Sequence, residues 1–316
     1  MLKQILFAAA ALSLAACETV TTPSDVRDRT PKDIGAFYDC LRERSLTIIA
    51  AHRGGDAPFE NAIPAFERTA SGAPSPVAIE TDVRRTRDGV LVLMHDEALD
   101  RTTTGTGPVA NVTAAQFAAL RLKDDAGKPT ATRPPTLRQA LDWAKGRAIL
   151  QLDVKRNTPI AEVIAVVRAA GAEQRVIIIV YTTEAAIAAH RLAPDLMLSV
   201  PAESIASLEG LSSMRFDMSR VLAWTGASQP NSALNVELAQ KKIEVIFGTI
   251  GSAATSWDNR FAREGDQGYA AFADTGIQMI SSGRPLEAMR ALDDADGPGV
   301  PANACLTARP MQVPAS

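Results

Sequence analysis

Short apolar runs alternate with longer amphipathic stretches along most of this chain, and this alternation constrains the fold more than any other feature. Strands that alternate with helical patterns of about 10–15 residues predict βαβ units and therefore a parallel sheet. The candidate strands are Leu46–Ala51, Val77–Asp82, Val90–His95, Ala148–Val154, Val176–Val180, Met197–Val200, Arg220–Trp224, Ile243–Phe247 and Ile277–Ile280.

The pattern is typical of an α/β protein of the (β/α)8 TIM-barrel type. Such a barrel takes about 250 residues, and the chain has 316. We expect the barrel domain to span 36–292 and an irregular tail to span 293–316. The candidate strands exceed the eight positions of a barrel by one, and Arg220–Trp224 is the weakest of them. The doubly wound alternative lacks its usual Gly-x-Gly-x-x-Gly turn after the first strand.

One connection does not fit a plain barrel. Only the residues from Val83 to Gly89 separate the second candidate strand from the third, and Asp88-Gly89 is a turn signal. That length is too short for a helical crossover between parallel strands. We therefore expect a hairpin at this point, which makes the sheet locally mixed.

The N-terminus reads MLKQILFAAAALSLAAC, with Lys3 before a short apolar run and small residues before Cys17. This pattern predicts a signal peptide over 1–16. The cysteine after Leu-Ala-Ala resembles the lipobox of bacterial lipoproteins, in which that thiol is acylated. The resemblance predicts a membrane anchor at Cys17 and, with Glu18 after it, an outer-membrane location facing the periplasm. An ordinary signal peptide or a buried apolar helix are the alternatives.

Residues 17–35 are rich in Thr, Ser, Pro, Asp and Arg, which predicts a flexible tether between membrane and barrel. The net charge is −3 without basic clustering, so the electrostatic footprint of a nucleic-acid-binding protein is missing. Two cysteines remain after Cys17, namely Cys40 and Cys305. Export implies an oxidising compartment, in which these two residues form either a disulfide or two separate thiols.

Polar residues follow the apolar runs directly. His52 and Arg53 follow the first candidate strand, and His95 ends the third. Because the active sites of barrel enzymes lie at the carboxyl ends of the strands, these positions are typical of catalytic residues. The third histidine, His190, lies in a helical pattern and is interpreted as structural.

Acidic residues alternate with apolar ones on two strands. Glu80 and Asp82 are two apart, so their side chains point to the same face. Asp153 and Lys155 share a face of the fourth strand in the same way. Buried carboxylates this close repel unless a cation lies between them, and carboxylate oxygens suit Mg²⁺ or Ca²⁺. The alternatives are an exposed acidic edge and an edge strand with a solvated polar face.

Two longer stretches, IIAAHRGGDAPFENAIPAFERT and IETDVRRTRDGVLVLMHDEALDRTTTGTG, carry a more specific signal. They resemble the N-terminal signature of the glycerophosphodiester phosphodiesterase family, which has His-Arg-Gly, Glu-Asn, Glu-x-Asp and His-Asp in this order, followed by Leu-Asp-Arg-Thr-Thr. The likeness continues more loosely through RLKD and PTLRQAL to LQLDVK. It covers more than the N-terminal half of the chain without its signal peptide.

The resemblance implies a role for each matching residue. His52 and His95 would form the acid–base pair, and Glu80, Asp82 and Asp153 would bind the divalent metal. The substrate-binding residues would be Arg53 and Lys155, which contact the phosphate, and Glu60, which supports the metal or the substrate. The family hydrolyses small glycerophosphodiesters, such as glycerophosphocholine, to glycerol 3-phosphate and an alcohol.

Several positions depart from the family pattern. Asp153 replaces a glutamate, which would change the position or the affinity of the metal. Phe59-Glu-Asn-Ala62 replaces Pro-Glu-Asn-Thr, and the expected Trp-Thr-Val-Asn and Thr-Asp-x-Pro motifs are altered near the C-terminus. The leaving alcohol is therefore open. Alternative functions are a phospholipase-like enzyme acting on lysophospholipids or phosphoinositides, and an anchored barrel that binds phosphodiesters without catalysis.

Overall fold

The computed structural model describes residues 28–55, 59–214, 216–296 and 302–310. The predicted signal peptide, 1–16, and the predicted lipidation site, Cys17, lie outside the described residues. Within the described ranges, no helix has both the length and the apolar character that a membrane crossing requires.

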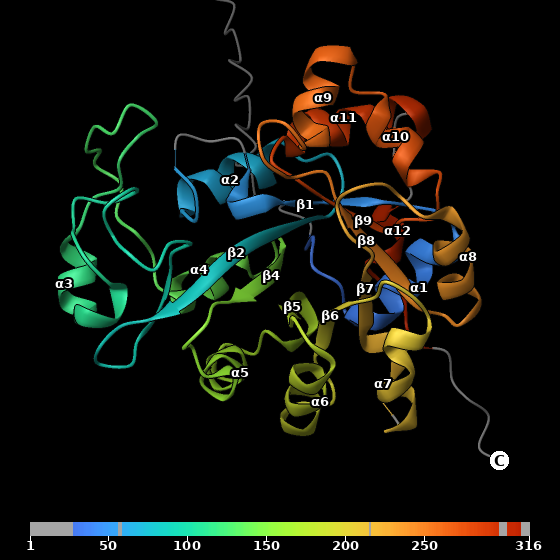
Figure 1. The fold of residues 1–316 in the computed structure, drawn as a ribbon, viewed down its shortest axis with the longest axis horizontal. Helices are drawn as coiled ribbons and strands as arrows, with labels where there is room; N and C mark the ends of the chain where they lie inside the picture. The colour runs from blue at the N-terminus through green and yellow to red at the C-terminus, as the bar shows by residue number, and fades with distance from the viewer. Residues whose placement is uncertain (1–27, 56–58, 215, 297–301, 311–316) are drawn as a thin grey trace, which may run out of the picture.

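Eight parallel strands close into a barrel (Figure 1), and the predicted (β/α)8 fold is confirmed. Because β1 pairs with both β2 and β9, the barrel is continuous around its circumference. Its strands are β1 (Ile48–Ala51), β2 (Val77–Arg85), β4 (Ile149–Val154), β5 (Val176–Ile179), β6 (Met197–Pro201), β7 (Val221–Trp224), β8 (Glu244–Gly248) and β9 (Met279–Ser282).

The strand outside the barrel is β3 (Leu91–Leu93), not Arg220–Trp224, so the expectation about the weakest strand was wrong. β2 runs past the barrel to Arg85, and β3 pairs antiparallel with its last three residues. The predicted hairpin is thus present. Val221–Trp224 is the regular barrel strand β7, paired with β6 and β8.

Helices cover the outside of the strands and pack against their outward-facing apolar side chains in one continuous core. One of these helices, α4, begins with a capping box, in which a threonine and a glutamine cap each other's backbone. The same device begins α3, which packs in a separate small core beside β3. The described helices are α1 (Ile34–Glu43), α2 (Ile63–Gly72), α3 (Ala114–Ala119), α4 (Leu137–Ala144), α5 (Ile160–Ala169), α6 (Thr183–Leu192), α7 (Glu209–Ser213), α8 (Ser232–Gln240), α9 (Trp257–Glu264), α10 (Gly268–Ala273), α11 (Pro285–Asp296) and α12 (Ala302–Cys305).

A second core fills the N-terminal end of the barrel. The inward-facing apolar residues of all eight barrel strands meet the buried side chains of α1, among them Phe37, Tyr38 and Leu41. This packing closes the N-terminal end. Polar side chains that continue the same inward face further along the strands therefore lie toward the opposite, C-terminal end.

The folded part extends further at both ends than the sequence predicts. The expected tether, 17–35, is packed against the barrel from residue 28: Arg29 donates hydrogen bonds to the carbonyl oxygens of Ala70 and Ala73, which α2 leaves free at its C-terminus. The expected tail, 293–316, begins inside α11 and includes the buried Cys305. Composition misses both boundaries because capping and covalent contacts hold these polar segments in place.

Cys40 and Cys305 form a disulfide, with their Cα atoms 5.6 Å apart. The disulfide joins α1 to α12, which lie side by side. Of the two states that the sequence leaves open, the structure therefore has the paired one. The cross-link connects the two ends of the folded part at the closed end of the barrel.

Candidate active site

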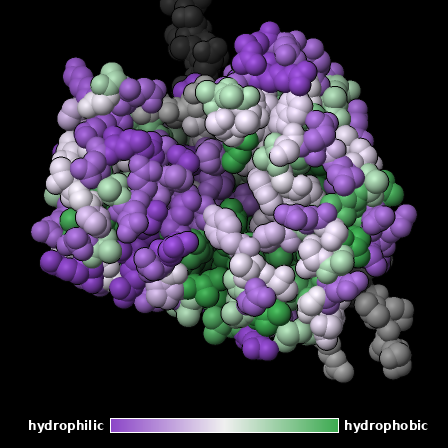
Figure 2. Space-filling model, in the orientation of Figure 1, coloured by the Kyte–Doolittle hydropathy of each residue, from purple (hydrophilic) through white to green (hydrophobic). Residues whose placement is uncertain are grey.

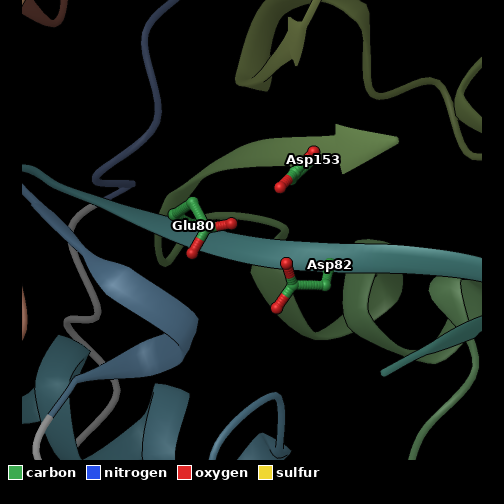
Figure 3. Close-up of side chains that lie close together, drawn as sticks. All are labelled: Glu80, Asp82 and Asp153. Carbon is green, nitrogen blue, oxygen red and sulfur yellow. The ribbon is translucent and has the colours of Figure 1, made fainter. Parts of the chain in front are cut away.

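Side-chain alternation along β2 and β4 directs three carboxylates into the barrel. Glu80 and Asp82 extend from β2 and Asp153 from the adjacent β4 (Figure 3), and Asp82 is in register with Asp153. Ligand oxygens of the three lie within 4.8 Å of one another. The residues are 5, 1 and 7% exposed, respectively. The alternative of an exposed acidic edge is therefore wrong, because all three carboxylates are buried.

Positive charge reaches only part of this triad. Lys155 Nζ lies 2.7 Å from Asp82 Oδ1 and 2.5 Å from Asp153 Oδ2. Burial opposes the ionisation of Asp82, but the Lys155 ammonium outweighs it and lowers the pKa of Asp82. Among the described residues, Glu80 receives a single hydrogen bond, from the amide of Arg53 at 2.8 Å. Burial and the neighbouring Asp82 carboxylate raise the pKa of Glu80.

These properties fit a divalent cation. The three carboxylates supply only oxygen ligands, which hard cations such as Mg²⁺ and Ca²⁺ prefer. The Arg53 amide and Lys155 compensate the charge of Glu80 only in part, since its pKa is still raised, and a cation beside it would complete the compensation. Asp153 is oriented by Tyr181, whose hydroxyl donates to Oδ1 at 2.5 Å. Glu80, Asp82 and Asp153 are thus the residues that would hold the ion.

A left-handed turn after β1 positions Arg53. Arg53, Gly54 and Gly55 have φ values of 53°, 93° and 99°. A Cβ atom on Gly54 would come within 2.6 Å of the Phe66 ring, so glycine is required there. The turn directs the backbone amide of Arg53 toward Glu80. It also places the guanidinium Nε of Arg53 3.7 Å from Asp82 Oδ2. The turn therefore explains the Arg-Gly part of the His-Arg-Gly motif: Arg53 contacts the triad, and Gly54 allows the turn that places it there.

Asn61 connects this turn to the triad, although it was not among the predicted site residues. Its side-chain amide donates to Asp82 Oδ2 at 2.7 Å, and its Oδ1 accepts from the Asp82 amide at 2.9 Å and from the Thr81 hydroxyl at 2.6 Å. Its own amide donates to the Arg53 carbonyl. The Glu-Asn motif was the available signal, but only the fold shows that the asparagine orients Asp82.

The two predicted histidines come from different kinds of strand. His52 begins the 3₁₀ turn η1 (His52–Gly54) directly after β1, whereas His95 follows β3. Because β3 is antiparallel to β2, it returns the chain to the barrel, where the Met94 amide donates to the Asp82 carbonyl at 2.9 Å. Burial, followed by the charge of Arg53, lowers the pKa of His52 to about 4, so its imidazole is neutral at pH 7.

A chain of charged side chains links His95 to the β1 turn. His95 Nδ1 lies 2.7 Å from Asp96 Oδ1, and Arg101 contacts both Asp96 at 2.6 Å and Glu60 at 2.6 Å. Glu60 in turn accepts from Arg53 Nη1 at 3.0 Å. Although burial opposes it, Arg101 lowers the pKa of Glu60. Asp96 and Arg101 belong to this site and were not among the predicted site residues.

The triad lies at one side of a cavity of about 570 Å³. On the face drawn in Figure 2, hydrophilic side chains gather over the segment that carries α3, and the surface is hollowed beside them near the centre. His52, Glu80 and Asp153 line the cavity together with Tyr181, which donates to Asp153, and Trp224. The arrangement places a candidate cation site and the His52 imidazole at the edge of a space of small-molecule size, with Arg53 and Lys155 on the carboxylates beside it.

Comparisons with known proteins agree with this arrangement. The sequence profile of the glycerophosphoryl diester phosphodiesterase family matches residues 52–206. Human glycerophosphodiester phosphodiesterase 1 is 38% identical over 109 residues, which cover 32% of this chain and 31% of the human protein. A glycerophosphodiester phosphodiesterase from Caldanaerobacter subterraneus is 32% identical over 167 residues, covering 49% of this chain and 66% of that protein. The chain therefore spans about a third of the mammalian relatives it matches.

Solved structures extend the likeness to the whole barrel. A glycerophosphoryl diester phosphodiesterase from Parabacteroides distasonis is 27% identical with a TM-score of 0.71, covering 86% of this chain and 89% of that one. An Oleispira antarctica phosphodiesterase, solved in complex with the product sn-glycerol-3-phosphate, shares the fold at 20% identity and a TM-score of 0.62, covering 80% of this chain and 99% of that one.

The matched segment, 52–206, contains the three carboxylates of the triad. It also contains the other predicted catalytic and substrate-binding residues, which are His52, His95, Arg53, Glu60 and Lys155. The fold, the order of the site residues and the matches to relatives from several organisms agree. This chain belongs to the glycerophosphoryl diester phosphodiesterase family.

Proposed function

We propose that this protein hydrolyses glycerophosphodiesters to glycerol 3-phosphate and an alcohol, and that the reaction requires a divalent cation. The observation that carries the proposal is the buried triad of Glu80, Asp82 and Asp153 at the same end of the barrel as His52 and His95. The glycerol 3-phosphate product bound to the Oleispira antarctica phosphodiesterase supports the product assignment.

The ion on the triad is Mg²⁺ or Ca²⁺ in this proposal. When bound, it neutralises non-bridging phosphate oxygens and stabilises the charge that develops at phosphorus. Arg53 and Lys155 add positive charge beside the triad and bind the phosphate from the protein side. Glu60 fixes the direction of the Arg53 guanidinium through their ion pair.

The two imidazoles form the acid–base pair. One removes a proton from the nucleophile, which is water or the glycerol 2-hydroxyl, and the other protonates the leaving alcohol. His52 is neutral at pH 7 and can therefore accept a proton. Asp96 occupies Nδ1 of His95, which leaves Nε2 as the nitrogen that exchanges a proton with the substrate.

The first test is release of glycerol 3-phosphate from glycerophosphocholine and glycerophosphoethanolamine by the protein that begins after Cys17. The reaction is run in Mg²⁺, in Ca²⁺ and after exhaustive EDTA treatment. We expect release in at least one cation and none in EDTA. Undiminished release in EDTA would contradict the cation requirement, and no release in either cation would contradict the small-diester substrate.

Replacement of either site histidine tests the acid–base pair. His52→Ala and His95→Ala should each lower kcat about 10²–10⁴-fold, the usual contribution of a general acid or base. His190→Asn is the matched control, because His190 lies on α6 and stacks on Phe216 at 3.9 Å between ring centroids. Near-normal turnover in a folded His52 or His95 variant would sink the assignment.

A lipid substrate is the second candidate function. Apolar residues also line the cavity, among them Ile179, Val180, Pro201 and Ile250, and Ile179 is in register with Asp153 of the triad. These residues provide a surface for an acyl chain, so lysophosphatidylcholine is assayed beside glycerophosphocholine. Hydrolysis of lysophosphatidylcholine alone would favour the lipid-active enzyme. A folded protein that binds these diesters and hydrolyses neither would favour the non-catalytic alternative.

We also propose that the protein is exported and anchored through acylated Cys17, facing the periplasm. The disulfide between Cys40 and Cys305 supports export, because disulfides persist in oxidising compartments. Mass spectrometry of the mature protein should find an N-terminal, acylated cysteine, and Cys17→Ser should release the protein from the membrane fraction. An unmodified N-terminus at Met1 would overturn this proposal.

A further inference from the structure

The deep end of the active-site cavity is polar and lacks protein partners. Gln151 on β4, Ser199 on β6 and Ser281 on β9 line the cavity and are 1, 2 and 4% exposed. None of the three side chains makes a hydrogen bond or ion pair with any residue that the structure describes. Their polar atoms border the open cavity instead of being sealed in the protein, so they can bond to a ligand that has hydrogen-bonding groups of its own.

Strand alternation places the three side chains in one layer. Two residues earlier on the same strands, Ile149, Met197 and Met279 belong to the apolar core that α1 closes. Gln151, Ser199 and Ser281 are therefore the first polar residues above this core on their inward faces. We call this set the polar floor. It lies deeper than Asp153, which follows Gln151 on the inward face of β4.

The chemistry of the polar floor selects against two kinds of ligand. An acyl chain pressed on it would leave two hydroxyls and an amide without partners, and each buried unsatisfied group costs roughly 1–3 kcal/mol. An anionic group would find no lysine or arginine, because none lines this cavity among the described residues. Hydroxyl and amide groups both donate and accept, which suits an uncharged moiety with several hydroxyls.

We propose that the polar floor binds the glycerol hydroxyls that the diester retains in the product, and so sets the orientation of the substrate. This inference rests on the proposed function. The glycerol moiety is small and common to all such diesters, which suits the closed end of the cavity. The alcohol that leaves points toward the open end, where Glu203 and Gln229 line the cavity beyond the strands.

The experiment compares two diesters on the full mature protein in the activating cation. Glycerophosphocholine carries hydroxyls only on the retained side, whereas bis(4-nitrophenyl) phosphate carries none. Ser199→Ala and Ser281→Ala should each lower kcat/KM for glycerophosphocholine about three- to tenfold relative to kcat/KM for bis(4-nitrophenyl) phosphate, as expected for one lost hydrogen bond. Inhibition by glycerol 3-phosphate should weaken by a similar factor relative to inhibition by inorganic phosphate.

Ser232→Ala is the matched control, because Ser232 is exposed on α8 and its hydroxyl makes no hydrogen bond to a described residue. The control should leave both ratios at the wild-type value. If the wild-type protein hydrolyses neither diester, the proposed function itself fails. If it hydrolyses both and the floor variants keep the wild-type ratios, only the polar floor is overturned. Glycerophosphoglycerol, whose leaving alcohol is also a polyol, serves as a third substrate. If the floor variants lower kcat/KM for glycerophosphoglycerol but not for glycerophosphocholine, the floor binds the leaving alcohol, and the inference is also overturned.

Discussion

Two buried carboxylate sites in this barrel have opposite environments. Asp258, at the start of α9, is 5% exposed and accepts four hydrogen bonds from uncharged donors. The donors are the Thr249 hydroxyl at 2.6 Å, the Tyr269 and Ser282 hydroxyls at 2.8 Å, and the Gly283 amide at 2.7 Å. These contacts join the ends of β8 and β9 to α9 and α10, so this carboxylate holds structure together.

The triad of Glu80, Asp82 and Asp153 is equally buried, but its three carboxylates share few uncharged side-chain donors, namely Asn61 on Asp82 and Tyr181 on Asp153. Lys155 bridges two of its members, and Glu80 receives one backbone hydrogen bond among the described residues. Burial alone therefore does not distinguish a functional carboxylate from a structural one. The distinguishing property is uncompensated charge, which a structural site avoids and a cation site requires.

The largest expected effect separates the two sites by activity. Glu80→Gln should lower kcat/KM about 10²–10³-fold, comparable to the loss of one electrostatic contact to the transition state. It should not lower the free energy of unfolding measured in EDTA, because it removes a charge that burial and Asp82 disfavour. Steady-state kinetics and urea unfolding measure the two quantities.

Glu244→Gln is the control for this replacement, since Glu244 is fully buried at the closed end of the barrel and pairs with Arg42 at 2.8 Å. It should retain activity. A Glu80→Gln variant that loses stability and keeps its activity would mean that Glu80 is a structural carboxylate, as Asp258 is, and the contrast between the two sites would fail.

Cation binding should stabilise the folded protein through the triad. At a cation concentration of about 100 times Kd, a single site adds about 2.7 kcal/mol to the free energy of unfolding. We expect this gain in the wild-type protein and in an Asp258→Asn variant, and its loss in Glu80→Gln. Urea unfolding in Mg²⁺, in Ca²⁺ and in EDTA measures the gain. An equal gain in all three proteins would place the ion elsewhere.

Asp258→Asn should act on stability first. An asparagine amide cannot accept all four hydrogen bonds, so the free energy of unfolding should fall by about 1–3 kcal/mol. The variant should keep its cation requirement. Unchanged stability together with an altered cation requirement would show that Asp258 belongs to the functional site, and the comparison between the two sites would fail.

The triad was predictable from sequence because it depends on local alternation. The period of two along β2 and β4 fixes the face of Glu80, Asp82 and Asp153, whatever the rest of the fold. His95 was placed at the site for an incorrect reason, namely as the end of a barrel strand. It reaches the site because the hairpin returns the chain to Asp82.

Three of the contacts that were not predicted join residues distant in sequence. Tyr181 on Asp153, Arg101 on Glu60, and Ser282 on Asp258 depend on which strand ends and loops become neighbours when the barrel closes. The domain predicted from composition, 36–292, was also shorter than the folded part that the structure describes. No local pattern shows that Arg29 would cap α2. The pairing of Cys40 with Cys305 was one of the two states that the sequence left open, and the structure has the disulfide.

The smallest expected effect is the pH dependence of stability without a cation. The pKa of Glu80 is raised above its ordinary value of 4.5 in the folded state. Its contribution is therefore fully present below about pH 4.5 and is lost as the pH rises through the folded-state pKa. Asp82 has a lowered pKa in the folded state, so its contribution to stability is fully present above its ordinary value of 3.8 and is lost only as the pH falls below that value. A window above about pH 5 thus isolates Glu80 from Asp82.

In EDTA, the wild-type protein should lose stability relative to Glu80→Gln as the pH rises from about 5 to about 8. Saturating Mg²⁺ or Ca²⁺ should remove this difference or reverse it, because a cation binds the ionised carboxylate. Glu244, whose pKa burial raises to about 8, contributes equally to both proteins and cancels in the comparison. Urea unfolding at three pH values measures the difference. Parallel pH profiles in EDTA would mean that Glu80 has other compensation, and its contrast with Asp258 would then disappear.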